Sequence, residues 1–506
     1  MGAQREERAA PGGELFSSRL ALLLTTLGMA VGTGNIWRFP RIVAKCGGGA
    51  FLIPWLIFLF AWSIPLLVLE LGMGRQSRRG CVGAFASFAG KKLGFLGTFV
   101  AFTCSAIMFY YAVVAGWCLR YLQLAARGAL HGLSGEGAEQ AFLGFSGSWE
   151  PVIYQVLAMA LAGGIVLFGV VRGIERANKV LIPALFTLLF VALGRSLTLP
   201  GAGEGLKFLF TVDWPLLADA NTWIEGLCQS AWSTGAGWGL MLTYGVYVSR
   251  RESVVQNAIF TGLGNNFASI IAAMAIIPAV FALAPAALGP ERLAELGGTA
   301  AFLTSGGPAS TGLTFIWIPA LFERMPAGSL FTALFFLTLF FAALSSLIAM
   351  VELAARVLID MGVARRPAVL LVAGAGIVLG IPSAINLTFF QNQDWAWGLG
   401  LMLSGLFVAL AVVRYGLARF RADALSEREG RLLERAFDYW ILFAIPAQFV
   451  VMLGWWFQQS VSWDPQGWYN PFGTFTVGTA LAQWAVALGV FAGVNRWLVG
   501  RSGGEG

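Results

Sequence analysis

The feature that most constrains this chain is a series of about a dozen apolar segments, each long enough to cross a bilayer as a helix of roughly 20 residues. Of the 506 residues, 58% are hydrophobic and 12% are charged, which excludes an ordinary soluble domain. We therefore predict an all-α polytopic membrane protein. The expected spans cover residues 19–41, 48–74, 93–126, 152–171, 178–197, 220–248, 254–284, 328–360, 367–387, 395–418, 434–458 and 473–499.

Basic residues gather in alternate loops between these segments, at 75–92, 172–179, 250–251, 365–366 and 414–435. Lys and Arg concentrate in the cytoplasmic loops of membrane proteins. The alternation predicts a multi-pass protein of the cell inner (plasma) membrane with both termini in the cytoplasm. The same loops account for the net charge of +7, because their basic residues orient the protein in the lipid bilayer. We therefore expect no nucleic-acid partner.

Two of the segments are interrupted by glycines. The first contains Gly28, Gly32 and Gly34, and the sixth has a glycine-rich stretch at 233–239. Backbone groups freed inside a bilayer are tolerated only within protein or beside a polar cavity. Small-residue packing between helices explains either stretch alone. Two breaks five spans apart instead favour inverted five-helix repeats with broken helices one and six, and with a ligand held between the breaks.

This repeat predicts the organisation of the whole chain. An odd number of spans per repeat makes the second repeat insert upside down. The loop between spans seven and eight contains a helical stretch at Thr299–Ser305 and a Gly306-Gly307-Pro308 turn, so we expect a folded external cap. The predicted parts are a cytoplasmic tail at 1–14, a first repeat (spans 1–5) at 15–197, a second repeat (spans 6–10) at 198–425 with its cap at 286–327, spans 11–12 at 426–499, and a cytoplasmic tail at 500–506.

The ends of an interrupted helix carry partial charges. Free N–H groups, here at Thr33 and Gly34, attract a carboxylate, whereas carbonyl groups at helix C-termini attract cations. A zwitterionic amino acid fits this arrangement, and so does a small hard cation that needs several oxygen ligands. Candidate side-chain oxygens in the neighbouring spans belong to Asn35, Ser233, Asn265, Ser345 and Ser346.

Three motifs in the first two spans belong together. Gly28–Pro40 is followed by Gly47-Gly48-Gly49-Ala50-Phe51 and by Glu70-Leu71-Gly72-Met73-Gly74-Arg75. They closely resemble the neurotransmitter:sodium symporter family, and the resemblance extends over the first ten spans. It implies a bacterial sodium-coupled symporter that imports an amino acid by alternating access, with substrate and two sodium ions at the unwound centres of helices one and six.

The resemblance also implies which residues hold the ions and the substrate. The first sodium ion would meet the carbonyl of Ala30, Asn35, Ser233, Asn265 and the substrate carboxylate. The second would meet carbonyls of Gly28, Val31 and Ala342 and the hydroxyls of Ser345 and Ser346. The substrate carboxylate would lie at Gly34 and Tyr111. The full substrate site would comprise Met29, Ala30, Thr33, Gly34, Ile107, Tyr111, Trp232, Ser233, Gly235, Trp238, Ser346 and Met350.

Met29 bears on the substrate class. It stands where monoamine carriers of the family have an aspartate, and a thioether cannot balance an amine. The resemblance therefore disfavours a monoamine substrate.

Three charged residues are candidate gates. In the family, Arg38 and Asp394 would pair across the outer vestibule, and Asp360 would belong to an inner gate. A snorkelling arginine and an N-cap aspartate that opens the tenth span are the alternatives for the first two. The family's N-terminal arginine–tryptophan motif is replaced here by Gly13-Glu14-Leu15-Phe16, which leaves Arg5 or Arg8 to reach Asp360.

A chloride site is a further hypothesis. Gln229, Ser233 and Ser269 stand where animal members of the family hold chloride, with Trp55 in the position of a tyrosine. No acidic residue occurs from Val254 to Ala284, so a cation there lacks a fixed negative charge. We hypothesise weak chloride dependence. The ions expected to bind are then Na⁺ and, on this hypothesis, Cl⁻.

Other functions are less well supported. A proton-driven transporter of the same fold and an amino-acid-binding membrane sensor both stay open. An enzyme is disfavoured because the chain has a single histidine, and its five cysteines lack metal-ligand spacing or a nucleophile constellation. Glu70, a carboxylate in an apolar helix, is expected to be a buried hydrogen-bond acceptor or a protonated acid rather than a proton carrier.

Overall fold

The computed structural model describes residues 14–132, 135–304 and 312–502. Within these ranges every regular element is helical. In the part of the chain that the structure describes, ten helices are long and apolar enough to cross a membrane, and one bent pair of helices makes eleven. The sixth predicted span is not among them, because it consists of two shorter helical pieces, Ala220–Ser233 and Leu240–Gly245. The predicted all-α membrane architecture is confirmed.

The first half of the chain contains spans one to five. Span one is broken into three pieces, and π-helical turns occur in spans two and five. The bounds are α1 (Arg19–Ala30), α2 (Thr33–Ile36) and α3 (Arg38–Lys45) for span one; α4 (Gly49–Phe58), η1 (Leu59–Ser63) and α5 (Ile64–Ser77) for span two; α7 (Gly94–Ala126) for span three; α9 (Glu150–Leu167) for span four; and η3 (Val170–Glu175) with α10 (Arg176–Leu197) for span five. Connecting helices are α6 (Cys81–Phe88), η2 (Lys91–Leu93), α8 (Gly135–Ser146), α11 (Ala202–Phe210) and α12 (Trp214–Leu217).

The second half contains spans six to twelve. Their bounds are α13 (Ala220–Ser233) and α14 (Leu240–Gly245) for the broken span six; α15 (Val254–Leu288); α19 (Gly328–Asp360); α20 (Arg365–Ile385); α21 (Leu387–Tyr415); η6 (Trp440–Ala444) with α24 (Ile445–Trp463); and α25 (Val477–Ser502). Connecting helices are α16 (Pro290–Glu295), α17 (Thr299–Thr304), η5 (Leu313–Trp317), α18 (Ile318–Phe322), α22 (Leu417–Ala424) and α23 (Glu427–Tyr439).

The start of span ten differs from the sequence prediction. The helix begins at Leu387 because the side chain of Asn386 accepts a hydrogen bond from the N–H of Phe389 at 2.9 Å and caps it. Asp394 therefore lies inside the helix, and the expectation that it opens the span is wrong. Hydropathy did not identify this first part of the helix because it contains the polar residues Gln391–Gln393.

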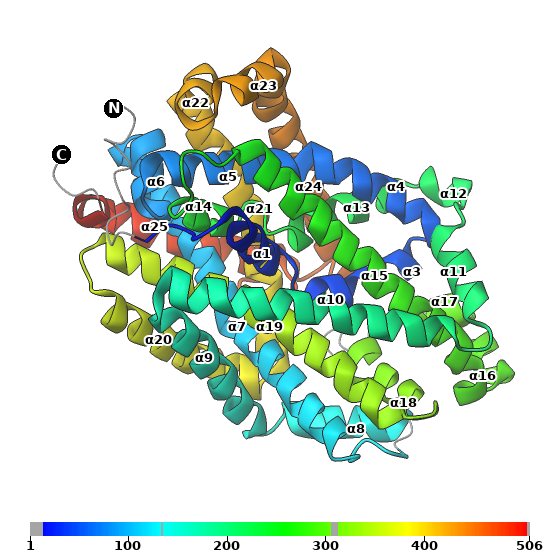
Figure 1. Cartoon of the computed structure of the whole chain (residues 1–506). Coiled ribbons are helices and arrows are strands. Elements are labelled where there is room, and N and C mark those ends of the chain that lie inside the picture. Colours follow the sequence, from blue (N-terminus) through cyan, green and yellow to red (C-terminus); the bar gives the residue numbers. More distant parts are fainter. Residues whose placement is uncertain (1–13, 133–134, 305–311, 503–506) are drawn as a thin grey trace.

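The two sides of the molecule are easily told apart. The end of α25 lies on one side of the molecule in Figure 1, where its last residues pack beside the end of α19: Leu498 and Val499 are grouped with Val357 and Met361. We call this the terminal side. The opposite side, which carries α16 to α18, is called the cap side.

The loop on the cap side is folded. It forms α16, α17, η5 and α18, and it buries Phe302, Leu303 and Phe315. Helix α17 packs against α3, so the loop lies next to the second half of span one. The predicted Gly306-Gly307-Pro308 turn lies outside the described residues.

Candidate functional site

Span one is broken where the sequence predicted. Helix α1 ends at Ala30, Val31 adopts an extended conformation with ψ of 97°, and Gly32 is also extended before α2 begins at Thr33. The two halves of the span are bent by 65°. Because the helical hydrogen bonds stop here, backbone groups at the middle of the span become available to other partners.

Polar side chains satisfy part of this break. The N–H of Gly32 donates to Asn35 Oδ1 at 2.9 Å, and the N–H of Thr33 donates to the hydroxyl of Tyr111 at 3.1 Å. A Cβ on Gly32 would lie 3.0 Å from Tyr111 Oη and 3.1 Å from Ser346 Oγ, so a larger residue there would crowd both hydroxyl groups. Gly34 faces open space instead, with nothing within 4 Å of its Cβ position.

Span six is broken by three glycines. Gly235, Gly237 and Gly239 have φ values of 72°, 87° and 76°, a left-handed conformation that glycine adopts without strain. The buried carboxylate of Glu70 accepts hydrogen bonds from the N–H groups of Gly237 at 2.6 Å and Met241 at 3.1 Å, and also from Gly239 and Leu242. Glu70 is thus the acceptor that holds the second half of this span.

An oxygen-rich cluster lies beside the first break. Asn35 Nδ2 is 2.7 Å from Asn265 Oδ1 and 2.8 Å from Ser269 Oγ. The other amide atom of Asn265 lies 3.1 Å from Ser233 Oγ. The side-chain amide of Asn265 is also 3.1 Å from the carbonyl oxygen of Ala30. The structure therefore brings together all the residues predicted for the first sodium ion.

The residues predicted for the second sodium ion come from α1 and α19. The hydroxyl of Ser346 donates to the carbonyl of Met29 at 3.4 Å, which places α19 against the end of α1. The hydroxyl of Ser345 donates to the carbonyl of Ala342 at 3.1 Å. Gly28 and Val31 lie on either side of the Met29 and Ala30 pair in this same segment.

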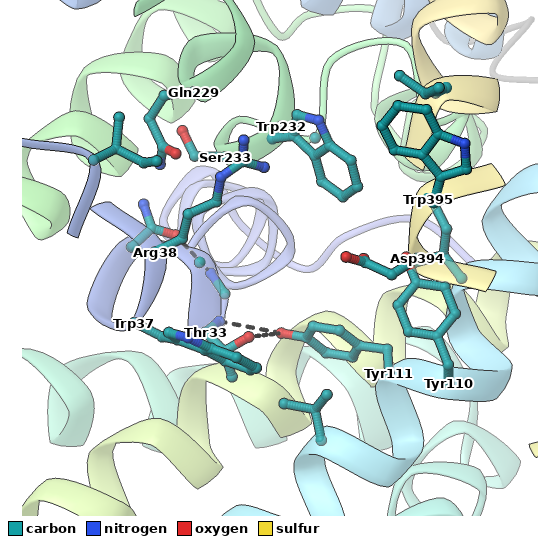
Figure 2. A pocket seen from close by; sticks show the side chains of 18 of the residues that line it. Thr33, Trp37, Arg38, Tyr110, Tyr111, Gln229, Trp232, Ser233, Asp394 and Trp395 are labelled. Carbon is teal, nitrogen blue, oxygen red and sulfur yellow. Dashed lines mark hydrogen bonds between the residues drawn. The ribbon is translucent and has the colours of Figure 1, made fainter. Parts of the chain in front are cut away.

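A cavity of about 530 Å³ opens between the two breaks (Figure 2). Apolar side chains of Met29, Ile107, Trp232 and Trp238 form much of its wall, and a Cβ on Gly235 would lie 3.6 Å from Met29 Cε. All twelve predicted substrate residues line it: Met29, Ala30, Thr33, Gly34, Ile107, Tyr111, Trp232, Ser233, Gly235, Trp238, Ser346 and Met350.

The predicted outer gate is not formed in this structure. Arg38 and Asp394 both line the cavity, but neither makes an ion pair within the described residues. Figure 2 shows the two side chains entering the cavity from different helices. The guanidinium of Arg38 lies 5.2 Å from the ring centre of Trp232, a cation–π arrangement. The cavity continues past both residues along α3, which packs against α17 of the cap side, and Trp463 and Phe475 also line it.

Several cavity residues were not predicted. Arg41 and Lys45 follow Arg38 on one face of α3, and Lys45 pairs with the buried Glu225 at 2.6 Å. The helical spacing of the three cations was visible in the sequence, whereas their approach to Glu225 of span six was not. The outer wall is aromatic and is formed by Trp395, Trp455, Trp456, Trp463 and Phe475.

Asp360 lies away from the cavity, on the terminal side. Its carboxylate is 2.7 Å from Arg356 Nη2 and accepts a hydrogen bond from the N–H of Gly80 at 2.5 Å. Arg5 and Arg8, the predicted partners, lie outside the described residues. Arg356, one turn before Asp360 on the same helix, was not considered as a partner from the sequence.

Comparison with known proteins decides the family. The chain matches the sodium:neurotransmitter symporter family over residues 13–131 and 143–498. The chain belongs to this family. Members are sodium-coupled transporters, so the predicted resemblance and the expectation that the chain is not an enzyme are both confirmed.

Similar proteins cover nearly the whole chain. An uncharacterized sodium-dependent transporter, YhdH of Bacillus subtilis (strain 168), is 30% identical over 458 residues, which are 86% of this chain and 96% of that protein. The sodium-dependent neutral amino acid transporter B(0)AT3 of Rattus norvegicus is 27% identical over 544 residues, covering 89% and 86%. The crystal structure of MhsT in complex with L-phenylalanine is 31% identical, has a TM-score of 0.74, and covers 87% of this chain and 98% of that one.

Proposed function

We propose that this symporter imports a neutral amino acid with a large apolar side chain, together with two sodium ions. The observation that carries the proposal is the cavity between the two breaks, which combines free helix ends, an oxygen cluster and an apolar wall. The carboxylate would meet Gly34 at the start of the second helical piece, where N–H groups favour an anion. Met29, Trp232 and Trp238 would enclose the side chain.

The donor set suits sodium. Hard cations prefer oxygen ligands, and the first cluster offers the carbonyl of Ala30 with the side-chain oxygens of Asn35, Ser233 and Asn265. The second set offers backbone carbonyls with the hydroxyls of Ser345 and Ser346. No charged side chain belongs to either set, so the positive charge of the ions would be balanced in part by the substrate carboxylate, which links the two binding events.

We further propose that the cap side is external. The terminal side carries the basic loops, including Arg78, Arg79 and Arg365, as expected for a cytoplasmic face. The cavity continues toward the cap side past Arg38 and Asp394, which form no ion pair with any residue that the structure describes. On the terminal side Asp360 is ion-paired and buried. This arrangement supports alternating access in which the structure represents the outward-facing state.

Chloride would bind beside the first sodium ion. Both amide atoms of the buried Gln229 and the indole N–H of Trp55 have no hydrogen-bond partner among the described residues. Ser233 and Ser269 supply hydroxyl groups nearby, and both contact Asn35 or Asn265. N–H and O–H donors together suit an anion. If chloride contributes, replacing it with gluconate lowers uptake; unchanged uptake excludes it.

Sodium-gradient uptake into proteoliposomes, with a panel of labelled amino acids, tests the main proposal. Moving two sodium ions through 100 mV and down a tenfold sodium gradient supplies about 7 kcal/mol. That is enough to concentrate the substrate many-fold against its own gradient. Asn35→Ala is expected to abolish the sodium dependence, whereas Asn470→Ala, in an exposed loop, serves as the matched control. Uptake that ignores sodium and follows pH would indicate the proton-driven alternative, and sodium-dependent binding without accumulation would indicate a sensor.

A further inference from the structure

Charged groups at the terminal end of α19 form a buried cluster that is separate from the cavity. It comprises Glu352, Arg356 and Asp360 of α19, Tyr247 after α14, and Arg365 at the start of α20. The side chains of Arg356 and Asp360 are 2% and 4% exposed, and that of Glu352 is fully buried. Charges buried to this degree are strongly destabilising unless they are paired.

Each carboxylate of the cluster has its own arginine. Arg356 Nη2 lies 2.7 Å from Asp360 Oδ1, and Arg365 Nη2 lies 2.5 Å from Glu352 Oε2. The hydroxyl of Tyr247 donates a further hydrogen bond to Glu352. Two cations thus balance two anions using residues of α19 and α20 alone.

Arg356 also reaches beyond its own helix. Its guanidinium lies 5.5 Å from the ring centre of Tyr247, and its Nη2 donates to the carbonyl of Arg78 at 3.4 Å. Arg78 in turn donates to the carbonyls of Val246 at 2.9 Å and Val248 at 2.6 Å. The side chain of Arg356 therefore connects α19 with the loop after α5 and with the chain that follows α14.

The beginning of span one rests on the same cluster. The N–H of Phe16 donates to the carbonyl of Tyr247 at 3.1 Å, and its ring packs edge-on against Tyr244 and Tyr247. A movement of span one that opened a path to the terminal side would separate Phe16 from Tyr247. It would also admit water to Arg356 and its partners.

We propose that Arg356 keeps the transport path closed on the terminal side by acting as the internal counter-ion of Asp360. The family resemblance assigns this task to an arginine of the N-terminal tail, whereas here α19 supplies the cation itself. Arg356 is thus a positioning residue, because it fixes Asp360 on the N–H of Gly80 and joins three parts of the chain. The inference rests on the proposed function, since it assumes that a path exists to be closed.

Alkylation of Cys81 offers a direct test. Cys81 follows Gly80, is buried, and its Sγ lies 3.8 Å from the carbonyl oxygen of Gly239 at the second break. In a full-length background where the other four cysteines are replaced by alanine, N-ethylmaleimide would report opening on the terminal side. The rate is measured in detergent without sodium or substrate, so it does not depend on transport. Melting temperature is recorded for each variant.

Four variants separate the possible partners of Asp360. We expect Arg356→Ala to raise the alkylation rate by about tenfold or more, because an unpaired buried carboxylate favours the open state. Arg356→Lys, which retains the charge, is expected to restore most of the protection. The double variant Arg356→Ala/Asp360→Asn removes both charges and should lower the rate again. Arg5→Ala/Arg8→Ala should label like the parent.

Three results would overturn the proposal. Faster labelling in the Arg5→Ala/Arg8→Ala variant, with none in Arg356→Ala, would show that the tail supplies the counter-ion. Equal labelling of Arg356→Ala, Arg356→Lys and the parent would show that Arg356 has no role in closure. A lower melting temperature without faster labelling would mark Arg356 as structural only. If the parent shows no sodium-driven uptake, the proposed function fails instead, whatever the labelling rates.

Discussion

Replacing Glu70 by glutamine tests whether its carboxylate holds the second half of span six. The carboxylate accepts four N–H groups, two on each oxygen, at 2.6 to 3.3 Å. Glutamine retains one carbonyl oxygen, but its NH₂ group would face two N–H donors. Two hydrogen bonds to a charged acceptor would be lost, each contributing about 1.5–3 kcal/mol, which gives about 3–6 kcal/mol in total. That is a large part of the stability of a typical protein, about 5–15 kcal/mol.

Thermal unfolding in detergent micelles, followed by tryptophan fluorescence, measures this loss. We expect a clearly lower melting temperature and weaker sodium-dependent substrate binding for Glu70→Gln. Glu204→Gln, at an exposed position of α11, is the matched control and should melt like the parent. A protonated Glu70 would already present one donor and one acceptor, much as glutamine does. Equal melting temperatures for Glu70→Gln and the parent would therefore refute the carboxylate interpretation.

Three further changes test other parts of the structure. Asn265→Ala removes the amide between Asn35 and Ser233, and we expect the sodium concentration for half-maximal binding to rise by about tenfold, equivalent to about 1.4 kcal/mol; an unchanged value would argue against this sodium site. Gly235→Ala adds a Cβ 3.6 Å from Met29 at a φ of 72°, so competition assays should show a shift toward smaller substrates, and an unchanged order of preference would contradict the assigned pocket. Glu429 is buried, which raises its pKa, but hydrogen bonds from Ser253 and Ser426 together hold that pKa below its usual value; the folded state is therefore stabilised above the ordinary carboxyl pKa of about 4.3, and this stabilisation is lost as the pH falls through the lowered value. Melting curves should accordingly show less acid destabilisation for Glu429→Gln than for the parent, and parallel curves would refute this.

The breaks and the residues that gather around them were predictable from the sequence, because these residues are close together or belong to recognisable motifs. Gly32 and Asn35 are three residues apart, and their hydrogen bond is local. The positions of Asn265 and Ser346 followed from the family resemblance. Hydropathy alone also located most spans, because each apolar segment has to match the bilayer thickness.

Contacts between distant segments were not predictable in the same way. The pair of Lys45 and Glu225 joins residues from spans one and six, and nothing in either local sequence indicates it. Arg356 is different, since an arginine four residues before Asp360 in an apolar helix does suggest an ion pair. The family pattern instead predicted an arginine of the N-terminal tail as the partner of Asp360. The start of α21 was missed because polar residues of its first turns face other protein segments, as Asn392 does with Thr479.

The two breaks are stabilised in different ways, and this difference bears on coupling. In span six, the free N–H groups are satisfied by Glu70, which does not line the cavity. In span one, the N–H groups of Gly32 and Thr33 are satisfied by Asn35 and Tyr111, which both line the cavity. A ligand in the cavity therefore competes with or reinforces the hydrogen bonds of span one but leaves those of span six unchanged. A ligand shifts an equilibrium only through interactions that differ between states. The segment that leads into span one also contacts the Arg356 cluster, because Phe16 binds Tyr247. Span one is thus the element through which sodium and substrate would control closure on the terminal side.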